Sequence, residues 1–151
     1  YLTDWNQSGL LDGIKPLVTA AKAAGYLTVV VTNQPQVSRG LLSEAALHAI
    51  HRRMMEELDG QLDAVYYCPH TDEAHCECRK PKAGMLLRGS RDLNIALDRS
   101  IMVGDSDRDV LAGTAAGCRT VFIRNLYNDA EAARCRPKFV VSNLSEIVAL
   151  L

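Results

Sequence analysis

Short runs of β-branched and aromatic residues alternate with segments of helical periodicity along most of this chain. Ile14, Leu17, Val18 and Ala21 repeat at helical spacing, and a run rich in Thr and Val follows Gly25. An apolar run of this length without alternation is typical of a strand that is covered on both faces. Strands that alternate with helices of this size predict βαβ units and a parallel sheet.

This pattern predicts an α/β fold, with a Rossmann-like parallel sheet flanked by helices and no large cap domain, in one domain over residues 1–151. We expect strands at residues 26–32, 64–67, 100–104, 120–123 and 139–141. We expect helices at residues 14–24, 43–58, 84–93, 107–116 and 144–151.

Charge and composition exclude several classes of partner. The net charge is −1 and only 5% of the residues are aromatic, so the chain offers neither a basic field nor an aromatic track for nucleic acid. No apolar run reaches the roughly 18 residues that span a bilayer, and no signal peptide opens the chain. We expect a monomer without nucleic-acid or membrane partners.

One loop carries a set of metal-ligating side chains within eleven residues: Cys68, His70, Cys76 and Cys78. Three thiolates and one imidazole form a closed tetrahedral set for Zn²⁺, with no position open for water. The sequence therefore predicts a structural zinc that staples this loop, with His75 as the alternative to His70. Metal thiolates indicate a reducing compartment, so we expect Cys118 and Cys135 to be free and the protein to be cytoplasmic.

Polar residues follow the first of the expected strands, at the edge of a parallel sheet where ligands bind. Thr32, Asn33 and Gln34 stand there, and a hydroxyl followed by backbone amides suits a phosphate oxygen. The alternative interpretation is an Asn-containing turn capped by Thr32.

Two further groups of charged residues suit the same ligand. Arg79 offers a bidentate fork and Lys80 a compact charge for phosphate, although a solvated basic turn would look the same. Asp105 comes directly after the expected strand at residues 100–104, and Asp109 follows one helical turn later. Both residues carry carboxylates, which are ligands that suit Mg²⁺. Helix capping by Asp107, with Asp105 in a turn, is the alternative.

These motifs resemble, in this order, the haloacid dehalogenase (HAD) superfamily of phosphatases. Its second, third and fourth motifs match residues 30–34 (VVTNQ), 79–85 (RKPKAGM) and 103–105 (VGD) with Asp109. The cysteine–histidine set matches the zinc-containing branch, which includes histidinol-phosphate phosphatase and D-glycero-D-manno-heptose-1,7-bisphosphate 7-phosphatase. Residues 37–40 (VSRG) and 82–85 (KAGM) resemble the heptose type, whereas the five residues between His70 and Cys76 are closer to the histidinol-phosphate type. The longer match favours the heptose type, so we expect a heptose 1,7-bisphosphate as substrate, with histidinol phosphate as the alternative.

The resemblance implies Mg²⁺-dependent hydrolysis of a phosphate monoester through an aspartyl-phosphate, with a small phosphorylated sugar as substrate. It implies that Thr32 binds the phosphoryl oxygens and that Lys80 offsets charge on the phosphate and the nucleophile. Asp105 and the Ser106 carbonyl become the expected magnesium ligands. The expected substrate-binding residues are Thr32, Asn33, Gln34, Pro35, Arg79 and Lys80.

The resemblance also implies an Asp-x-Asp-Gly motif, with a nucleophilic and an acid–base Asp, on a central first strand upstream of the position that Tyr1 matches. Residues 1–151 contain no such motif, and neither Asp4 nor Asp12 follows an expected buried strand. We therefore expect a domain truncated at its N-terminus, with its central first strand missing and two strand edges unpaired. We expect residues 1–151 to be inactive on their own.

A different function class remains open. A non-catalytic relative could keep the zinc and bind a phosphorylated ligand or a partner chain. A DNA 3′-phosphatase module is disfavoured by the balanced charge and the scarcity of aromatic residues. The catalytic hypothesis requires Thr32, Lys80 and Asp105 to converge on one anion pocket.

Overall fold

The computed structural model describes residues 10–151 and divides the chain into two compact units, Tyr1–Cys76 and Glu77–Leu151. Asp4, which is rejected as a nucleophile on the sequence, lies outside the described residues. The assignment of residues 1–151 to a single domain stays a prediction.

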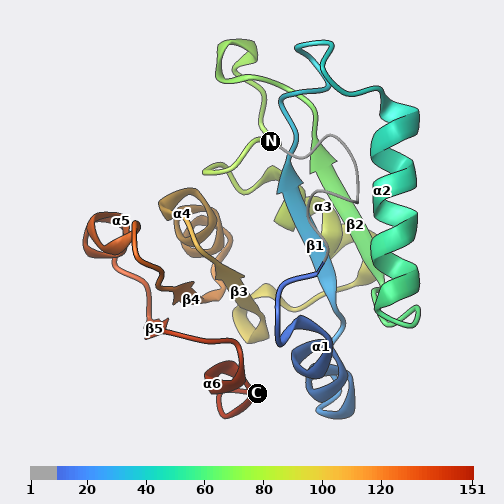
Figure 1. Cartoon of the computed structure of the whole chain (residues 1–151). Helices are drawn as coiled ribbons and strands as arrows, with labels where there is room; N and C mark the ends of the chain where they lie inside the picture. The colour runs from blue at the N-terminus through green and yellow to red at the C-terminus, as the bar shows by residue number, and fades with distance from the viewer. Residues whose placement is uncertain (1–9) are drawn as a thin grey trace. The chain divides into compact units, whose positions relative to one another are not determined.

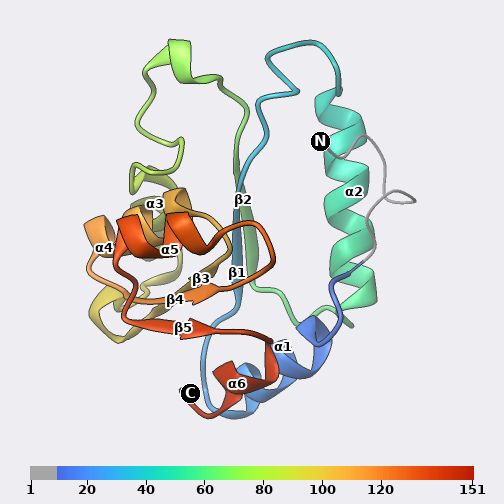
Figure 2. The ribbon, with the colours of Figure 1, turned by 60° about the vertical axis from the view of Figure 1, so that its left-hand side comes forward.

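The first unit contains one parallel strand pair and two long helices. Its elements are α1 (Ile14–Ala23), β1 (Val29–Asn33), α2 (Glu44–Glu57), β2 (Ala64–Cys68) and the short 3-10 helix η2 (Asp72–Ala74). β1 and β2 run parallel, with Val29 opposite Ala64 and Asn33 opposite Cys68. Figures 1 and 2 show α2 beside this strand pair. Val18 of α1 packs with Leu58 and Leu62 in the core of this unit.

Side-chain hydrogen bonds mark the starts of α2 and β1 in this unit. The Ser43 hydroxyl accepts from the Ala46 amide at 3.1 Å, so the capped helix predicted at residues 43–58 is confirmed. β1 starts three residues later than expected, because the Thr28 amide donates to the Asp63 carboxylate at 2.7 Å. All five residues of β1 are half-buried, so the expectation of a strand covered on both faces is wrong. In a two-stranded sheet each strand lies at an edge, which leaves its residues partly accessible.

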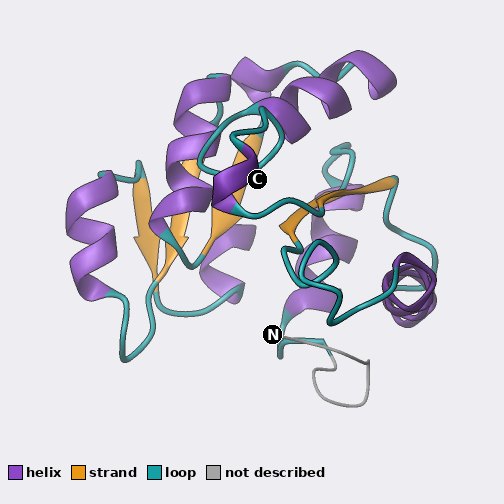
Figure 3. Cartoon of the chain, turned by 90° about the horizontal axis from the view of Figure 1, so that it is seen from above, coloured by secondary structure: helices purple, strands orange, loops and turns teal. Residues whose placement is uncertain are grey.

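The second unit contains a three-stranded parallel sheet. Its elements are α3 (Gly84–Leu93), the 3-10 helix η3 (Leu97–Arg99), β3 (Ile101–Gly104), α4 (Asp107–Ala116), β4 (Arg119–Ile123), α5 (Asp129–Cys135), β5 (Phe139–Val141) and α6 (Ser145–Val148). The strand order is β3-β4-β5, and Figure 3 shows these strands side by side. Val110, Phe122, Ala132 and Cys135 form a buried cluster in this unit.

The predicted α/β class and the parallel pairing are confirmed in the described residues. The helices at residues 84–93 and 107–116 match α3 and α4, and Gly117 ends α4 at φ 84°, a conformation that favours glycine. α5 was not predicted, and α6 is shorter than expected. In the described part of the chain, no helix combines the length and the apolar character needed to cross a bilayer.

Candidate functional site

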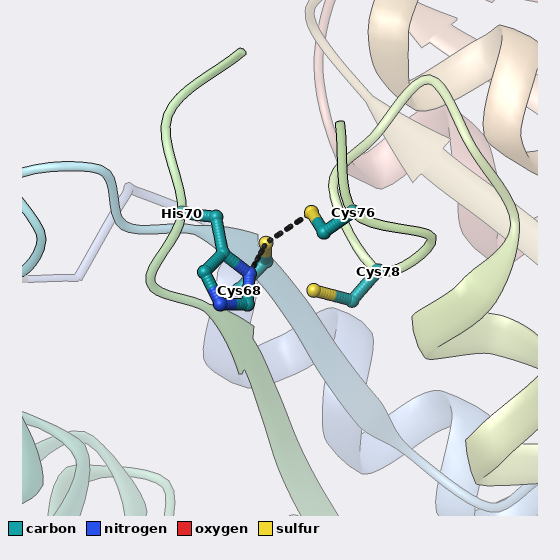
Figure 4. A group of neighbouring side chains, drawn as sticks. All are labelled: Cys68, His70, Cys76 and Cys78. Atoms are coloured by element: carbon teal, nitrogen blue, oxygen red, sulfur yellow. Dashed lines mark hydrogen bonds between the residues drawn. The ribbon is translucent and has the colours of Figure 1, made fainter. Parts of the chain in front are cut away.

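The cysteine–histidine loop brings its four predicted ligands together. Cys68 ends β2 and is fully buried, and the short helix η2 then reverses the chain toward Cys76. The Cys68 sulfur lies 3.5 Å from His70 Nδ1 and 3.6 Å from the Cys76 sulfur. The ligand atoms of Cys68, His70, Cys76 and Cys78 all lie within 4.8 Å of one another, and Figure 4 shows them facing a common centre.

This donor set fits a tetrahedral metal without further ligands. His70 belongs to the group, whereas His75 is exposed and lies outside it, and the assignment of His70 as a zinc ligand stays a prediction. Cys118 and Cys135 are free thiols, as expected, and burial raises the pKa of both. These two thiols therefore stay protonated at neutral pH.

A glycine fixes the path of the chain after the cysteines. The Gly84 amide donates to the Glu77 carbonyl at 3.2 Å, and a Cβ at Gly84 would lie only 2.2 Å from that oxygen. The close approach therefore requires glycine at this position. It holds Glu77 and Cys78 against the first turn of α3.

The polar residues at the end of β1 are linked through their side chains. Gln34 Nε2 donates to the Thr32 hydroxyl oxygen at 3.0 Å, and Gln34 Oε1 accepts from Gln36 Nε2. Because the Thr32 oxygen accepts from Gln34, its own proton can be donated elsewhere, as a phosphoryl oxygen requires. Gln36, which is only 2% exposed, was not singled out from the sequence.

The loop that follows β1 is tied to the start of the cysteine loop. The Gln34 amide donates to the Cys68 carbonyl at 2.7 Å. Ser38 donates to the Pro69 carbonyl through its hydroxyl at 2.6 Å and through its amide at 3.3 Å. The metal loop thus supports the backbone that carries Thr32 and Gln34.

Lys80 and Asp109 form a shielded ion pair in the second unit. Lys80 Nζ lies 2.5 Å from Asp109 Oδ1, and the two side chains are 13% and 11% exposed. Asp109 Oδ2 also accepts from the Ser106 hydroxyl at 3.0 Å and from the Ser106 amide at 3.3 Å. A Cβ at Gly104 would lie 2.2 Å from the Asp109 Cβ, so glycine makes room for this carboxylate.

Asp105 and Ser106 differ as candidate metal ligands. Asp105 directly follows β3 and is exposed, so a hard carboxylate stands at the carboxyl end of the strand. The Ser106 hydroxyl is the N-cap of α4, which corrects the alternative that Asp107 caps this helix. The Ser106 carbonyl accepts from the amides of Asp109 and Val110 at 3.2 and 3.4 Å, so it is directed along the helix.

The other predicted site residues lie at the end of β1 and after the cysteine loop. Asn33 ends β1, Pro35 is buried beside it, and Arg79 is half-buried. Thr32 belongs to the first unit, while Lys80 and Asp105 belong to the second, so their convergence stays a prediction. Asp12 lies exposed in the turn before α1, which agrees with its rejection as a nucleophile.

Comparisons with known proteins agree with these features. The HAD-hydrolase-like family model matches residues 77–147. The D-glycero-beta-D-manno-heptose-1,7-bisphosphate 7-phosphatase of Pasteurella multocida is 34% identical over 100% of this chain and 88% of its own length. The enzyme of the same description from Haemophilus ducreyi is 36% identical over 98% of this chain and 87% of its own length.

A solved structure extends the likeness to three dimensions. The D,D-heptose 1,7-bisphosphate phosphatase from B. bronchiseptica, complexed with magnesium and phosphate, superposes with a TM-score of 0.89. It is 29% identical, and the match covers 99% of this chain and 87% of that one. The chain belongs to the HAD-like hydrolase family, in the branch of the heptose bisphosphate phosphatases. The protein is therefore a phosphatase by family.

Proposed function

We propose that the protein hydrolyses the 7-phosphate of D-glycero-D-manno-heptose 1,7-bisphosphate, with Mg²⁺ as cofactor. The observations that carry this proposal are the shielded Lys80–Asp109 pair and the exposed Asp105 carboxylate that follows β3, on a chain whose relatives are named for that activity. A shielded cation suits a phosphate monoester, and a strand-end carboxylate suits a divalent metal.

Each site residue has a role in this proposal. Thr32 donates its hydroxyl proton to a phosphoryl oxygen, because its oxygen already accepts from Gln34. Lys80 offsets the charge of the phosphate, and Asp109 holds the Lys80 ammonium in place. Asn33, Gln34 and Pro35 line the substrate site, and Arg79 contacts the distal phosphate or hydroxyl groups.

Asp105 would hold Mg²⁺, whereas the Ser106 carbonyl, the other expected ligand, already accepts from the Asp109 and Val110 amides. Bound there, the ion reduces the repulsion between an anionic nucleophile and an anionic phosphate. The proposed nucleophile is an aspartate of the Asp-x-Asp-Gly type that forms an aspartyl-phosphate, and it is not among residues 1–151.

The cysteine–histidine group is proposed to bind a structural zinc. Its donors complete a tetrahedron by themselves, so the metal would have no open position for substrate. Its role would be to hold the loop to which the Gln34 amide and Ser38 are bonded. The reduced thiols of Cys118 and Cys135 are compatible with a reducing, cytoplasmic compartment.

The experiment is an assay of phosphate release by the full-length protein that contains residues 1–151. The substrates are heptose 1,7-bisphosphate and histidinol phosphate, each with and without Mg²⁺. Mg²⁺-dependent release from the heptose 7-position, with a higher kcat/KM than for histidinol phosphate, supports the proposal. A preference for histidinol phosphate would assign the protein to the second type, which the short spacing from His70 to Cys76 favours.

A non-catalytic function is the second candidate, because residues 1–151 contain no Asp-x-Asp-Gly motif. In that case the full-length protein would bind zinc and a phosphorylated ligand but release no phosphate. Calorimetric binding of inorganic phosphate without turnover of either substrate would favour this candidate.

A further inference from the structure

Asn128 occupies a helix N-cap but does not use its side chain as a cap. It precedes α5, and its backbone carbonyl accepts from the Glu131 and Ala132 amides at 3.1 and 3.2 Å. Asparagine is favoured at such positions because its side-chain oxygen accepts from the amides of the first turn. Here the side chain makes no such bond and is only 4% exposed. Helix capping therefore does not account for its position.

The Asn128 side chain instead joins the ends of two strands. Its Nδ2 donates to the Asp105 carbonyl, just after β3, at 2.8 Å, and to the Ile123 carbonyl, at the end of β4, at 2.9 Å. Its Oδ1 accepts from the Asn125 amide at 2.8 Å. Both polar atoms of the amide group thus have partners, and the carbonyl of Asp105 is held by a buried donor.

A second residue near the start of α5 holds the same loop on the other side of Ser106. Glu131 Oε2 accepts from the Asp107 amide at 3.0 Å. The backbone on both sides of Ser106 is therefore fixed from one short segment, while the Asp105 side chain stays exposed. A metal-binding carboxylate on a loop depends on such supporting hydrogen bonds for its position.

We propose that Asn128 is a positioning residue for magnesium binding: its buried amide group fixes the Asp105 carbonyl and thereby the direction of the Asp105 carboxylate. This inference depends on the proposed role of Asp105 in the phosphatase reaction. It assigns a function to a residue that lies outside the motifs at residues 30–34, 79–85 and 103–109.

The test compares two isosteric changes in one loop of the full-length protein. Asn128→Asp keeps the oxygen that accepts from Asn125 but replaces the donor group with an oxygen that faces two carbonyls. Asn125→Asp adds the same charge three residues away and keeps the oxygen that accepts from the Tyr127 amide at 2.8 Å. The readout is the Mg²⁺ dissociation constant from calorimetry with Mg²⁺ alone, together with kcat and the Mg²⁺ activation constant.

We expect Asn128→Asp to raise the Mg²⁺ dissociation constant about 10-fold or more, while Asn125→Asp leaves it within about 2-fold of the wild-type value. If Asn128→Asp does not fold, Asn128→Ser removes the amide donors without adding charge, and the same criterion applies. Equal Mg²⁺ affinity of the Asn128 variant and the wild type would overturn the inference, as would a wild type that binds no Mg²⁺. A wild type that binds Mg²⁺ but hydrolyses neither substrate would overturn the proposed function alone, because the affinity comparison would still test Asn128.

Discussion

Lys80 Nζ and Asp109 Oδ1 lie 2.5 Å apart, and both side chains are largely shielded from solvent. The pair joins the segment after the cysteine loop to the first turn of α4. Two neighbouring residues accommodate the pair: Gly104 leaves space for the Asp109 side chain, and the Ser106 hydroxyl donates to Asp109 Oδ2.

Asp109→Asn should therefore destabilise the protein and lower its activity. The change removes the carboxylate charge that pairs with the shielded Lys80 ammonium, and the loss of one member of a shielded ion pair costs up to about 3–5 kcal/mol. Urea unfolding measures the loss. Asp107→Asn is the matched control, because its pair with Arg134 is more exposed and should contribute less than about 1 kcal/mol. Equal losses for the two variants would contradict the importance of the Lys80–Asp109 pair.

Thr32→Val removes a hydroxyl at nearly constant shape. If the Thr32 proton is donated to a phosphoryl oxygen, kcat/KM should fall about 10²–10³-fold, as it does when one donor to a developing negative charge is lost. The melting temperature should change little because Thr32 is only half-buried. Steady-state kinetics of the full-length protein measure the effect, and an unchanged kcat/KM would remove Thr32 from the proposed mechanism.

The proposed zinc can be tested by metal content. Purified protein should contain about one equivalent of zinc that resists a magnesium chelator, because a four-ligand site is closed. Cys76→Ser should lose the metal and lower the melting temperature. Cys118→Ser, which alters a thiol outside the group, should keep it. Zinc content that is insensitive to Cys76→Ser would show that the metal lies elsewhere.

Asp63 should make the first unit sensitive to acid. Burial would raise the pKa of this carboxyl, but hydrogen bonds from Lys22 and Thr28 outweigh it and hold the pKa below its ordinary value. The stabilisation is therefore complete above the unfolded pKa of about 4 and is lost as the pH falls through the lower folded value.

Asp63→Asn should lower the free energy of unfolding by about 1–3 kcal/mol at neutral pH, and this difference should shrink as the pH falls below about 4. Asp59→Asn is the control, since the Lys15–Asp59 pair is exposed and contributes less than about 1 kcal/mol. Urea unfolding of both variants across the acid range measures the effect. A difference that grows with acid would contradict the assignment.

The sequence predicted the elements whose signals are local. The predicted limits of α4, Asp107 to Ala116, match the structure, and Gly117 ends the helix as expected, although the N-cap is Ser106 and not Asp107. The cysteine–histidine group was predicted because its ligands lie within eleven residues, a spacing that a single loop can close. α5 was missed because it is short and buries only Ala132 and Cys135, which leaves little helical periodicity to detect.

Hydrogen bonds between residues far apart in the sequence could not be predicted from the sequence alone. Asp109 was selected from the sequence as a carboxylate that suits Mg²⁺. Its partner Lys80 is 29 residues away, so only the fold shows that the two residues pair. Asn128 resembles an ordinary N-cap in the sequence, and only the structure directs its side chain to Asp105 and Ile123. β1 starts later than predicted for a similar reason, because the Thr28 amide donates to Asp63, 35 residues away.

The most direct measurement is the rate of phosphate release from heptose 1,7-bisphosphate by the full-length protein and by its Asp105→Asn variant, in the presence of Mg²⁺. We predict rapid release from the 7-position by the wild type and a loss of several orders of magnitude in the variant, because an exposed strand-end carboxylate is the proposed metal ligand. Equal rates for the two proteins, or no release by the wild type, would contradict the account.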